Sequence, residues 1–201
     1  MRVGRFARGF EYPLIGAFVA MSFWPSAALA QNHDTHSLTP AHHDMTPAQK
    51  RQANELVKIV REATERFRNV KQAEGEGYGL LFGCVSGGDF GAMGLHFVNP
   101  KLAFDGELDA RTPEIVLYEP TSNGRVRLTG ADYLVIADAW NAKHSSPPEL
   151  NGQLFHFFES PNRFGLPPFY TLHVWAWKDN PNGTFVNWNP NVSCDGFNGQ
   201  R

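Results

Sequence analysis

The 201-residue chain has little of several features that would assign it to a functional class. It has only two cysteines, which excludes a small disulfide-rich protein. Its 18 basic residues are balanced by 20 acidic residues, so the net charge of -2 gives no electrostatic reason to bind nucleic acid. HExxH, GxSxG and CxxC motifs are all absent, and no internal repeat is present. With 42% hydrophobic residues, the chain nevertheless has enough apolar side chains for a folded domain.

Residues 1–30 have the features of a secretory signal peptide. Three arginines precede a mostly apolar stretch from Pro13 to Trp24, and Ala28-Leu29-Ala30 fits the A-x-A cleavage pattern. The apolar stretch is short for a transmembrane helix, although an uncleaved membrane anchor is the alternative. We expect export to the periplasm or the extracellular space, with no integral membrane segment left after cleavage. The mature chain would have 15 basic and 19 acidic residues, a net charge of -4.

Residues 31–45, QNHDTHSLTPAHHDM, form a polar stretch in which we expect a disordered linker. Cleavage after Ala30 would make His33 the third residue of the mature chain. A free amine, two backbone amides and this imidazole form the square-planar geometry that Cu(II) and Ni(II) favour. Other histidines of the linker would add further ligands. A solvated linker without metal is the alternative.

We expect residues 46–201 to form a single globular domain that begins with a long helix. Thr46 and Gln49 fit a capping box, with Pro47 at the first helical position. Apolar residues then follow at spacings of three and four as far as about Ala73. After Gly77 the pattern becomes that of strands, separated by clusters of Gly, Pro and Asn. The expected strands are residues 78–85, 92–98, 115–118, 125–136, 154–158 and 169–177.

This order of elements predicts an α+β fold, with one long N-terminal helix packed on a curved, mainly antiparallel sheet of five or six strands. The segments between the strands lack a strong helical pattern, which argues against parallel βαβ units. An NTF2-like cone accounts for a long helix that precedes the strands, and a lipocalin-like barrel is the alternative. Fold alone assigns no activity.

Cys84 and Cys194 are expected to form one disulfide bond between an early strand and the C-terminal segment, because an oxidising compartment favours their pairing. Closing a loop of about 110 residues would stabilise the fold by roughly 4 kcal/mol. A pair of soft metal ligands or a reactive thiol is the alternative.

The expected strand 169–177 carries the strongest candidate site. Alternation of side chains places an aromatic face with one histidine on one side of this strand. Such a face would line an apolar pocket for a small molecule. The alternative is that the face packs beneath the long helix and that His173 only bonds to a carbonyl. The residues of this face are Phe169, Thr171, His173, Trp175 and Trp177.

A second histidine, His96, lies on the expected strand 92–98, where alternation puts Met93 on the opposite face. If His96 and His173 share one face of the sheet, they form a pair. Two imidazoles and a carboxylate suit Zn, Cu or non-haem Fe. Alternatively, one of the two histidines acts as acid or base beside a carboxylate. The further candidates for this site are Glu119, Asp132 and His156.

Four segments of the chain resemble a family of secreted bacterial proteins of unknown function. The resemblance covers most of the chain after Thr46, and it implies export and a single domain. It implies no catalytic or binding residue. The segments are GAMGLHFVNP, PEIVLYEP, RVRLTGADYLV and LHVWAWKDNPNGTFVNWNPNVSC.

Three functions follow from these patterns. The first is an exported protein that binds a small molecule or a metal ion, Cu or Zn, in a pocket containing His173. The second is an exported lyase, isomerase or hydrolase that uses His96 or His173 with Glu119 or Asp132. The third is a structural or envelope-interaction module. The geometry of the two histidines distinguishes these functions, because His96 and His173 within about 5 Å of one another, beside a carboxylate, favour a metal or catalysis.

Overall fold

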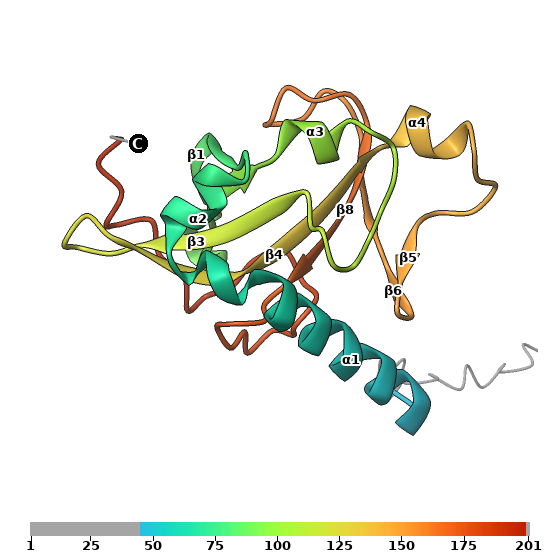
Figure 1. The fold of residues 1–201 in the computed structure, drawn as a ribbon, viewed down its shortest axis with the longest axis horizontal. Helices are drawn as coiled ribbons and strands as arrows, with labels where there is room; N and C mark the ends of the chain where they lie inside the picture. Colours follow the sequence, from blue (N-terminus) through green and yellow to red (C-terminus); the bar gives the residue numbers. More distant parts are fainter. Residues whose placement is uncertain (1–44, 200–201) are drawn as a thin grey trace, which may run out of the picture. The chain divides into compact units, whose positions relative to one another are not determined.

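The computed structural model describes residues 45–199. The expected signal peptide, most of the linker and His33 lie outside the described residues. The described part is α+β, with the longest helix near its start, the strands after it and three short helical segments between strands (Figure 1). None of its helices combines the length and apolar character needed to cross a bilayer.

Helix α1 (Pro47–Thr64) begins where the sequence predicts it. The Gln49 amide donates to Thr46 Oγ1 at 3.2 Å, and the Thr46 amide donates to Gln49 Oε1 at 2.8 Å. This reciprocal pair is a capping box. The prediction of one continuous helix to Ala73 is wrong.

The helical segment is interrupted because Asn69 adopts an extended backbone conformation. A single 3-10 turn, η1 (Glu65–Arg68), follows α1, and α2 (Val70–Gly75) then begins with Asn69 as its cap. The Asn69 side chain accepts a hydrogen bond from the Lys71 amide at 3.2 Å. A local cap of this kind competes with continuation of the helix.

Six strands form a curled antiparallel sheet in the order β1-β2-β3-β4-β8-β7, which confirms the expected fold class of a helix on a curved sheet. The strands of this sheet are β1 (Gly79–Ser86), β2 (Ala92–Val98), β3 (Ile115–Pro120), β4 (Val126–Ile136), β7 (His156–Phe158) and β8 (Phe169–Val174). The remaining elements are η2 (Gly88–Phe90), α3 (Pro100–Ala103), α4 (Ala137–Asn141) and the hairpin of β5 (Glu149–Leu150) and β6 (Gln153–Leu154).

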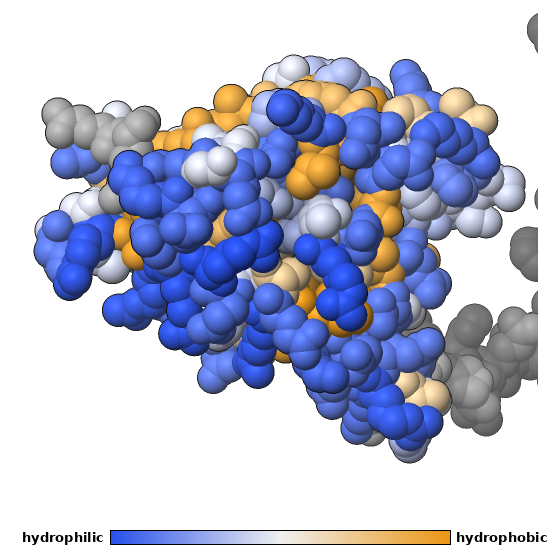
Figure 2. All heavy atoms as spheres, viewed as in Figure 1, coloured by the Kyte–Doolittle hydropathy of each residue, from blue (hydrophilic) through white to orange (hydrophobic). Residues whose placement is uncertain are grey.

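Helix α1 packs across β4 and β8 on one face of the sheet (Figure 1). Its buried Leu56 and Val60 belong to one apolar cluster with Leu172 and Val174 of β8. Hydrophilic residues cover most of the molecular face on which α1 lies (Figure 2). His173 is not part of this cluster, so the alternative in which its face packs beneath the helix is wrong.

The opposite face of the sheet carries a separate apolar cluster that includes Ile115, Leu134 and Phe169. Alternation along β4 and β8 determines which side chains point to which face. The residues next to His173 and Asp132 in sequence belong to the cluster beneath α1, so by alternation His173 and Asp132 point away from the helix and toward this second cluster. The sheet thus separates a helix side from a pocket side.

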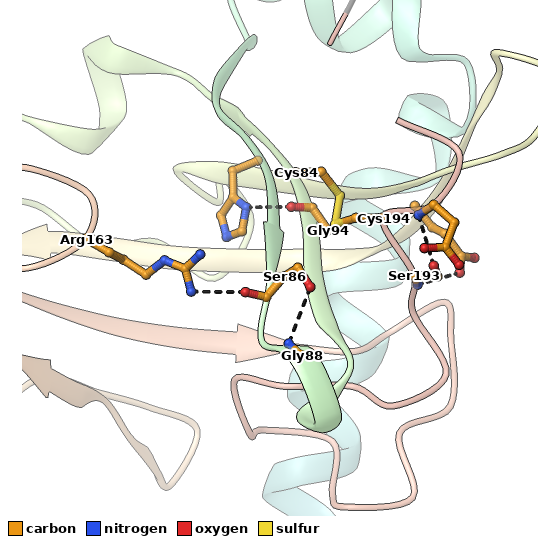
Figure 3. The surroundings of a disulfide bond; sticks show 10 residues. Cys84, Ser86, Gly88, Gly94, Arg163, Ser193 and Cys194 are labelled. Atoms are coloured by element: carbon orange, nitrogen blue, oxygen red, sulfur yellow. Dashed lines mark hydrogen bonds between the residues drawn. A yellow bond between two sulfur atoms is a disulfide. The ribbon is translucent and has the colours of Figure 1, made fainter. Parts of the chain in front are cut away.

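The predicted disulfide bond between Cys84 and Cys194 is confirmed (Figure 3). The two Cα atoms are 5.8 Å apart, and 110 positions of sequence separate the residues. The bond connects the edge strand β1 to the C-terminal segment. No cysteine is therefore left to act as a thiol nucleophile or a thiolate ligand.

Candidate metal centre

Three buried polar residues from three strands meet on the pocket side of the sheet: His96 on β2, Asp132 on β4 and His173 on β8. Each offers one ligand atom, and these three atoms all lie within 4.8 Å of one another. Asp132 and His173 are directly opposite in the β4–β8 ladder, which brings their side chains together. The two imidazole rings have centroids 5.8 Å apart. The predicted pairing of the histidines beside a carboxylate is therefore present.

The orientation of His96 is set by a backbone carbonyl. Its Nδ1 lies 3.1 Å from the Gly94 oxygen, the contact that ends at Gly94 in Figure 3. A carbonyl only accepts, so this contact assigns the ring proton to Nδ1 and leaves Nε2 with a lone pair. Burial lowers the pKa of His96 to about 4, so the ring is neutral at pH 7. Metal-binding histidines commonly donate their second ring N–H to a carbonyl in this way.

Asp132 is held by its neighbour on β8. The Thr171 hydroxyl donates to Asp132 Oδ1 at 2.5 Å. Burial raises the pKa of Asp132 to about 6, against the nearby His96 imidazole and the Thr171 hydrogen bond, which lower it. The carboxyl therefore still ionises at neutral pH although it is buried.

Of the three residues, His173 has the fewest hydrogen bonds to its side chain. Its Nδ1 lies 3.3 Å from Asp132 Oδ1, yet neither ring nitrogen makes a hydrogen bond to any described residue. Burial lowers the pKa of His173 to about 3. The ring is therefore neutral, and the Asp132 and Asn187 side chains beside it do not reach hydrogen-bond geometry with either of its nitrogens. A buried polar group left unpaired costs about 1–3 kcal/mol, so this position calls for a partner that the side chains do not supply.

Asn187 is a further polar residue beside His173. Its amide oxygen is buried and has no hydrogen-bond partner in the described part of the chain. The Asn187 side chain raises the pKa of His173, the direction expected of an acceptor next to the ring, and so opposes the larger effect of burial. Asn187 belongs to the environment of the centre, and the sequence analysis did not single it out.

The three residues open onto a small apolar cavity of about 20 Å³. This space holds about one water-sized occupant and is far too small for a drug-sized ligand. The apolar residues that line it are Phe82, Met93, Ile115, Leu134, Phe158, Phe164, Leu166 and Phe169. The centre is therefore surrounded almost entirely by hydrocarbon.

Residues 159–168, here called the roof loop, supply Phe164 and Leu166 to the cavity. Asn162 shapes this loop, because its side chain donates to the carbonyls of Glu159 and Leu166 and accepts from the amides of Phe164 and Leu166. The Arg163 guanidinium donates to the Ser86 carbonyl at 3.1 Å and so ties the loop to β1 (Figure 3). The Phe164 ring lies 6.5 Å from the His96 ring.

The predicted aromatic lining is right only for Phe169. Trp177 lies on the helix side, where its Nε1 donates to Thr64 Oγ1 at 2.9 Å. The reason is that β8 ends at Val174, after which the chain turns and alternation no longer applies. Trp175 stays beside His173, with ring centroids 6.1 Å apart, but it does not line the cavity.

Met93 lines the cavity with His96, whereas alternation put it on the opposite face. The cause is Gly94, whose φ of +86° interrupts the regular strand. The β1–β2 register shifts at this point, since Val85 pairs with Gly94 and Ser86 pairs with Ala92. A side chain at position 94 would meet the Tyr118 carbonyl oxygen at 2.4 Å, so only glycine fits.

Two other candidates are not brought into the centre. The Glu119 carboxylate accepts from Lys178 Nζ at 2.7 Å and from the Ser193 amide at 3.2 Å. His156 is exposed on β7, and its Nε2 lies 3.4 Å from the Phe185 carbonyl oxygen. Neither residue contributes a ligand atom to the cluster of His96, Asp132 and His173.

Comparison of the chain with protein-family models, with curated proteins and with solved structures found no match. The resemblance to secreted bacterial proteins therefore stays a prediction from the sequence.

Proposed function

We propose that the protein binds one divalent transition-metal ion between His96, Asp132 and His173. The observation that carries this proposal is the state of His173, a fully buried imidazole that lies 3.3 Å from a carboxylate oxygen and makes no hydrogen bond within the described residues. A cation would accept the lone pair of this ring and neutralise the buried carboxylate beside it. Both changes reduce the free-energy cost of burying an unpaired imidazole and a charged carboxylate.

The distances fit such an ion. Ligand atoms about 2.1 Å from a tetrahedral metal lie about 3.4 Å from each other, close to the observed His173–Asp132 separation of 3.3 Å. No two ligand atoms of the cluster are more than 4.8 Å apart, so they need to move by less than about 1 Å each to close around an ion. Side-chain rotation is sufficient for a movement of this size.

The donor set favours Zn(II) and Cu(II). Both metals accept imidazole nitrogen together with a carboxylate oxygen, and the lack of a free thiolate argues against Cu(I) and an iron–sulfur cluster. The neutral histidines meet the requirement that ligands be deprotonated. The hydrogen bonds that orient His96 and Asp132 correspond to the outer partners of metal sites.

A catalytic metal is the second candidate function. Three protein ligands with a fourth position at a cavity are typical of catalytic zinc rather than of structural zinc. The cavity limits the reactant in this conformation to a molecule about the size of water. Acid–base catalysis without metal has less support, because an imidazole with a pKa of about 3 is a poor base at neutral pH.

Export forms part of the proposal. A disulfide bond between residues far apart in the sequence is typical of proteins that fold in an oxidising compartment. The positively charged and apolar N-terminal residues of the sequence point in the same direction.

The test is the metal content of protein purified from the compartment to which it is exported, measured by elemental analysis. We expect about one equivalent of zinc or copper in the wild type and less than a tenth of that in His173→Ala and Asp132→Asn. Asp132→Asn keeps the size of the side chain, so loss of metal from a folded Asn variant cannot be assigned to unfolding. His144→Ala is the control, because His144 is exposed and stacks on Trp140. Unchanged metal content in both site variants would refute the proposal.

A further inference from the structure

A second concave region lies on the helix side of the sheet, away from the cavity of the metal centre. It is an open groove of about 660 Å³ between η1, the turn that joins β3 to β4, the first residues of β4 and Trp177. Its lining residues are Arg68, Thr121, Ser122, Asn123, Arg125, Val126, Arg127, Leu128 and Trp177. Three of these are arginines and none is acidic.

The arginines of the groove are poorly neutralised. The guanidinium groups of Arg125 and Arg127 make no ion pair and no hydrogen bond within the described residues. Arg68 has one acidic partner, Glu65, at 3.2 Å, and both side chains are about 60% exposed. An exposed ion pair of this kind contributes little free energy, so Glu65 leaves Arg68 available to a ligand. In a chain of net charge -2, the groove is thus a local concentration of positive charge.

The carboxylate opposite Arg127 in the sheet already has hydrogen-bond partners. Glu119 is opposite Arg127 in the β3–β4 register, but its oxygens accept from Lys178 Nζ at 2.7 Å and from the Ser193 amide. It is not among the residues that line the groove. The positive charge of Arg127 is therefore directed at solvent rather than at a partner within the described part.

The turn between β3 and β4 adds hydrogen-bond donors. The Thr121 hydroxyl donates to Asn123 Oδ1 at 2.7 Å, and the Arg125 amide donates to the same oxygen at 3.3 Å. The oxygen acceptor of Asn123 is thus used inside the turn. Its Nδ2 group makes no hydrogen bond to the described residues, so Asn123 offers donors to a ligand.

Trp177 gives the groove an apolar wall and fixes one of the arginines. Its ring is half-buried, and the Arg68 guanidinium lies over it at 4.3 Å from the centroid. Stacking on an aromatic ring restricts the orientation of a guanidinium while leaving its N–H groups for other partners. Arg68 is therefore partly pre-organised for binding.

From this arrangement we infer that the groove is a binding site for an oligoanion, a ligand that carries two or more carboxylate or phosphate groups. The guanidinium fork matches both groups, and it can bind each of them through two parallel hydrogen bonds. Arg127 is the second residue of β4 and Arg125 directly precedes the strand, so their Cα atoms are at most about 7 Å apart. A ligand that spans both must be longer than a single phosphate ion. The inference does not depend on the metal centre.

The test is calorimetric titration of the chelator-treated protein with three probes: tripolyphosphate, tetragalacturonic acid and neutral maltotetraose. The chelator removes any bound metal ion, so tripolyphosphate cannot bind to the protein by coordinating that ion. We expect saturable binding of at least one anionic probe, weakened by added salt, and no binding of maltotetraose. The anion that binds with the higher affinity identifies the ligand class as phosphate-bearing or carboxylate-bearing.

The decisive variant is the double substitution Arg125→Ser and Arg127→Ser, with Arg51→Ser as the matched control. Both groove arginines are exposed, as is Arg51 on α1, which lies outside the groove. We expect at least a tenfold loss of affinity in the double variant and no change in the control. The inference is overturned if neither anion binds, if maltotetraose binds equally well, or if the double variant retains wild-type affinity.

Discussion

Asp132 is the residue on which the two histidines of the candidate metal centre converge. Its carboxylate lies beside His173 and accepts from Thr171, and the His96 imidazole contributes to its pKa. Within the described part of the chain, the Thr171 hydroxyl makes no hydrogen bond to another candidate ligand. Its function in the proposed centre is therefore to orient the carboxylate.

We expect Thr171→Val to weaken metal binding by about 10- to 100-fold, the usual cost of losing a hydrogen bond to a metal ligand. Competition with a chelator of known affinity measures the change. Thr129→Val is the matched control, because the Thr129 hydroxyl is buried without a hydrogen-bond partner in the described part. Equal losses in the two variants would show that the hydrogen bond to Asp132 does not matter.

Glu114 makes the stability of the fold dependent on pH. Burial raises the pKa of this carboxyl to about 9, although the Leu134 amide donates to it at 3.0 Å and lowers the pKa. The folded state therefore keeps a proton that the unfolded chain, with a pKa near 4.3, releases. The stabilisation of the fold that this pKa difference contributes is complete below about pH 4, and it is lost as the pH rises toward 9.

Glu114→Gln is expected to remove much of this dependence, because the amide stays neutral and retains an acceptor oxygen. Each unit of pKa difference corresponds to about 1.4 kcal/mol in the free energy of unfolding. Urea unfolding at pH 5, 7 and 9 measures the effect. We expect the wild type to lose stability across this range by more than the variant does, and parallel profiles for the two proteins would contradict the assignment.

Single residues of the site were predictable where a regular strand carries them. Alternation along β8 correctly grouped Phe169, Thr171 and His173. It failed at Trp177, beyond the end of the strand, and at Met93, beside the positive-φ Gly94. Asn187 was not predicted, because it lies in an irregular segment whose position depends on tertiary contacts.

At the scale of elements, the start of α1 and the approximate strand positions were predictable because caps and turn residues act locally. The break at Asn69 was not, since the apolar spacing continues through it. The sequence of the roof loop, SPNRFGLPP, is rich in turn-forming residues and indicates only a connection between two strands. Its role follows from Asn162, whose hydrogen bonds fold the loop so that Phe164 and Leu166 cover the cavity.

We expect Asn162→Ala to speed the loss of metal without removing a ligand. The substitution deletes four hydrogen bonds that shape the roof loop, so the cavity should open to solvent more often. The rate of metal transfer to an excess of chelator should rise at least tenfold, while the stoichiometry stays at one. An exposed asparagine on the surface of α1, Asn54, provides the control variant Asn54→Ala. Unchanged release from Asn162→Ala would contradict the proposed role of the loop.

At the scale of the whole molecule, the disulfide bond connects the edge strand β1 to the C-terminal segment. Reduction, or the double substitution Cys84→Ala and Cys194→Ala, should lower the free energy of unfolding by about 2–5 kcal/mol. Denaturant unfolding of the oxidised, reduced and substituted proteins measures this change. Identical midpoints for all three would show that the bond adds nothing to stability.

The two faces of the sheet are expected to bind different ligands. The pocket side holds neutral imidazoles and one carboxylate in an apolar setting, whereas the helix side carries the exposed arginine groove. The overall charge of the chain predicted neither site, since a net charge of -2 averages over both. Their separation by the sheet means that variants of one site should leave binding at the other unchanged.

The most direct test of the central claim is the anomalous diffraction of a crystal grown with one equivalent of zinc. We expect a single strong peak within about 2.0–2.2 Å of His96 Nε2, a His173 ring nitrogen and an Asp132 oxygen. A map with zinc bound only at other positions, or with no bound zinc, would contradict a metal centre at His96, Asp132 and His173.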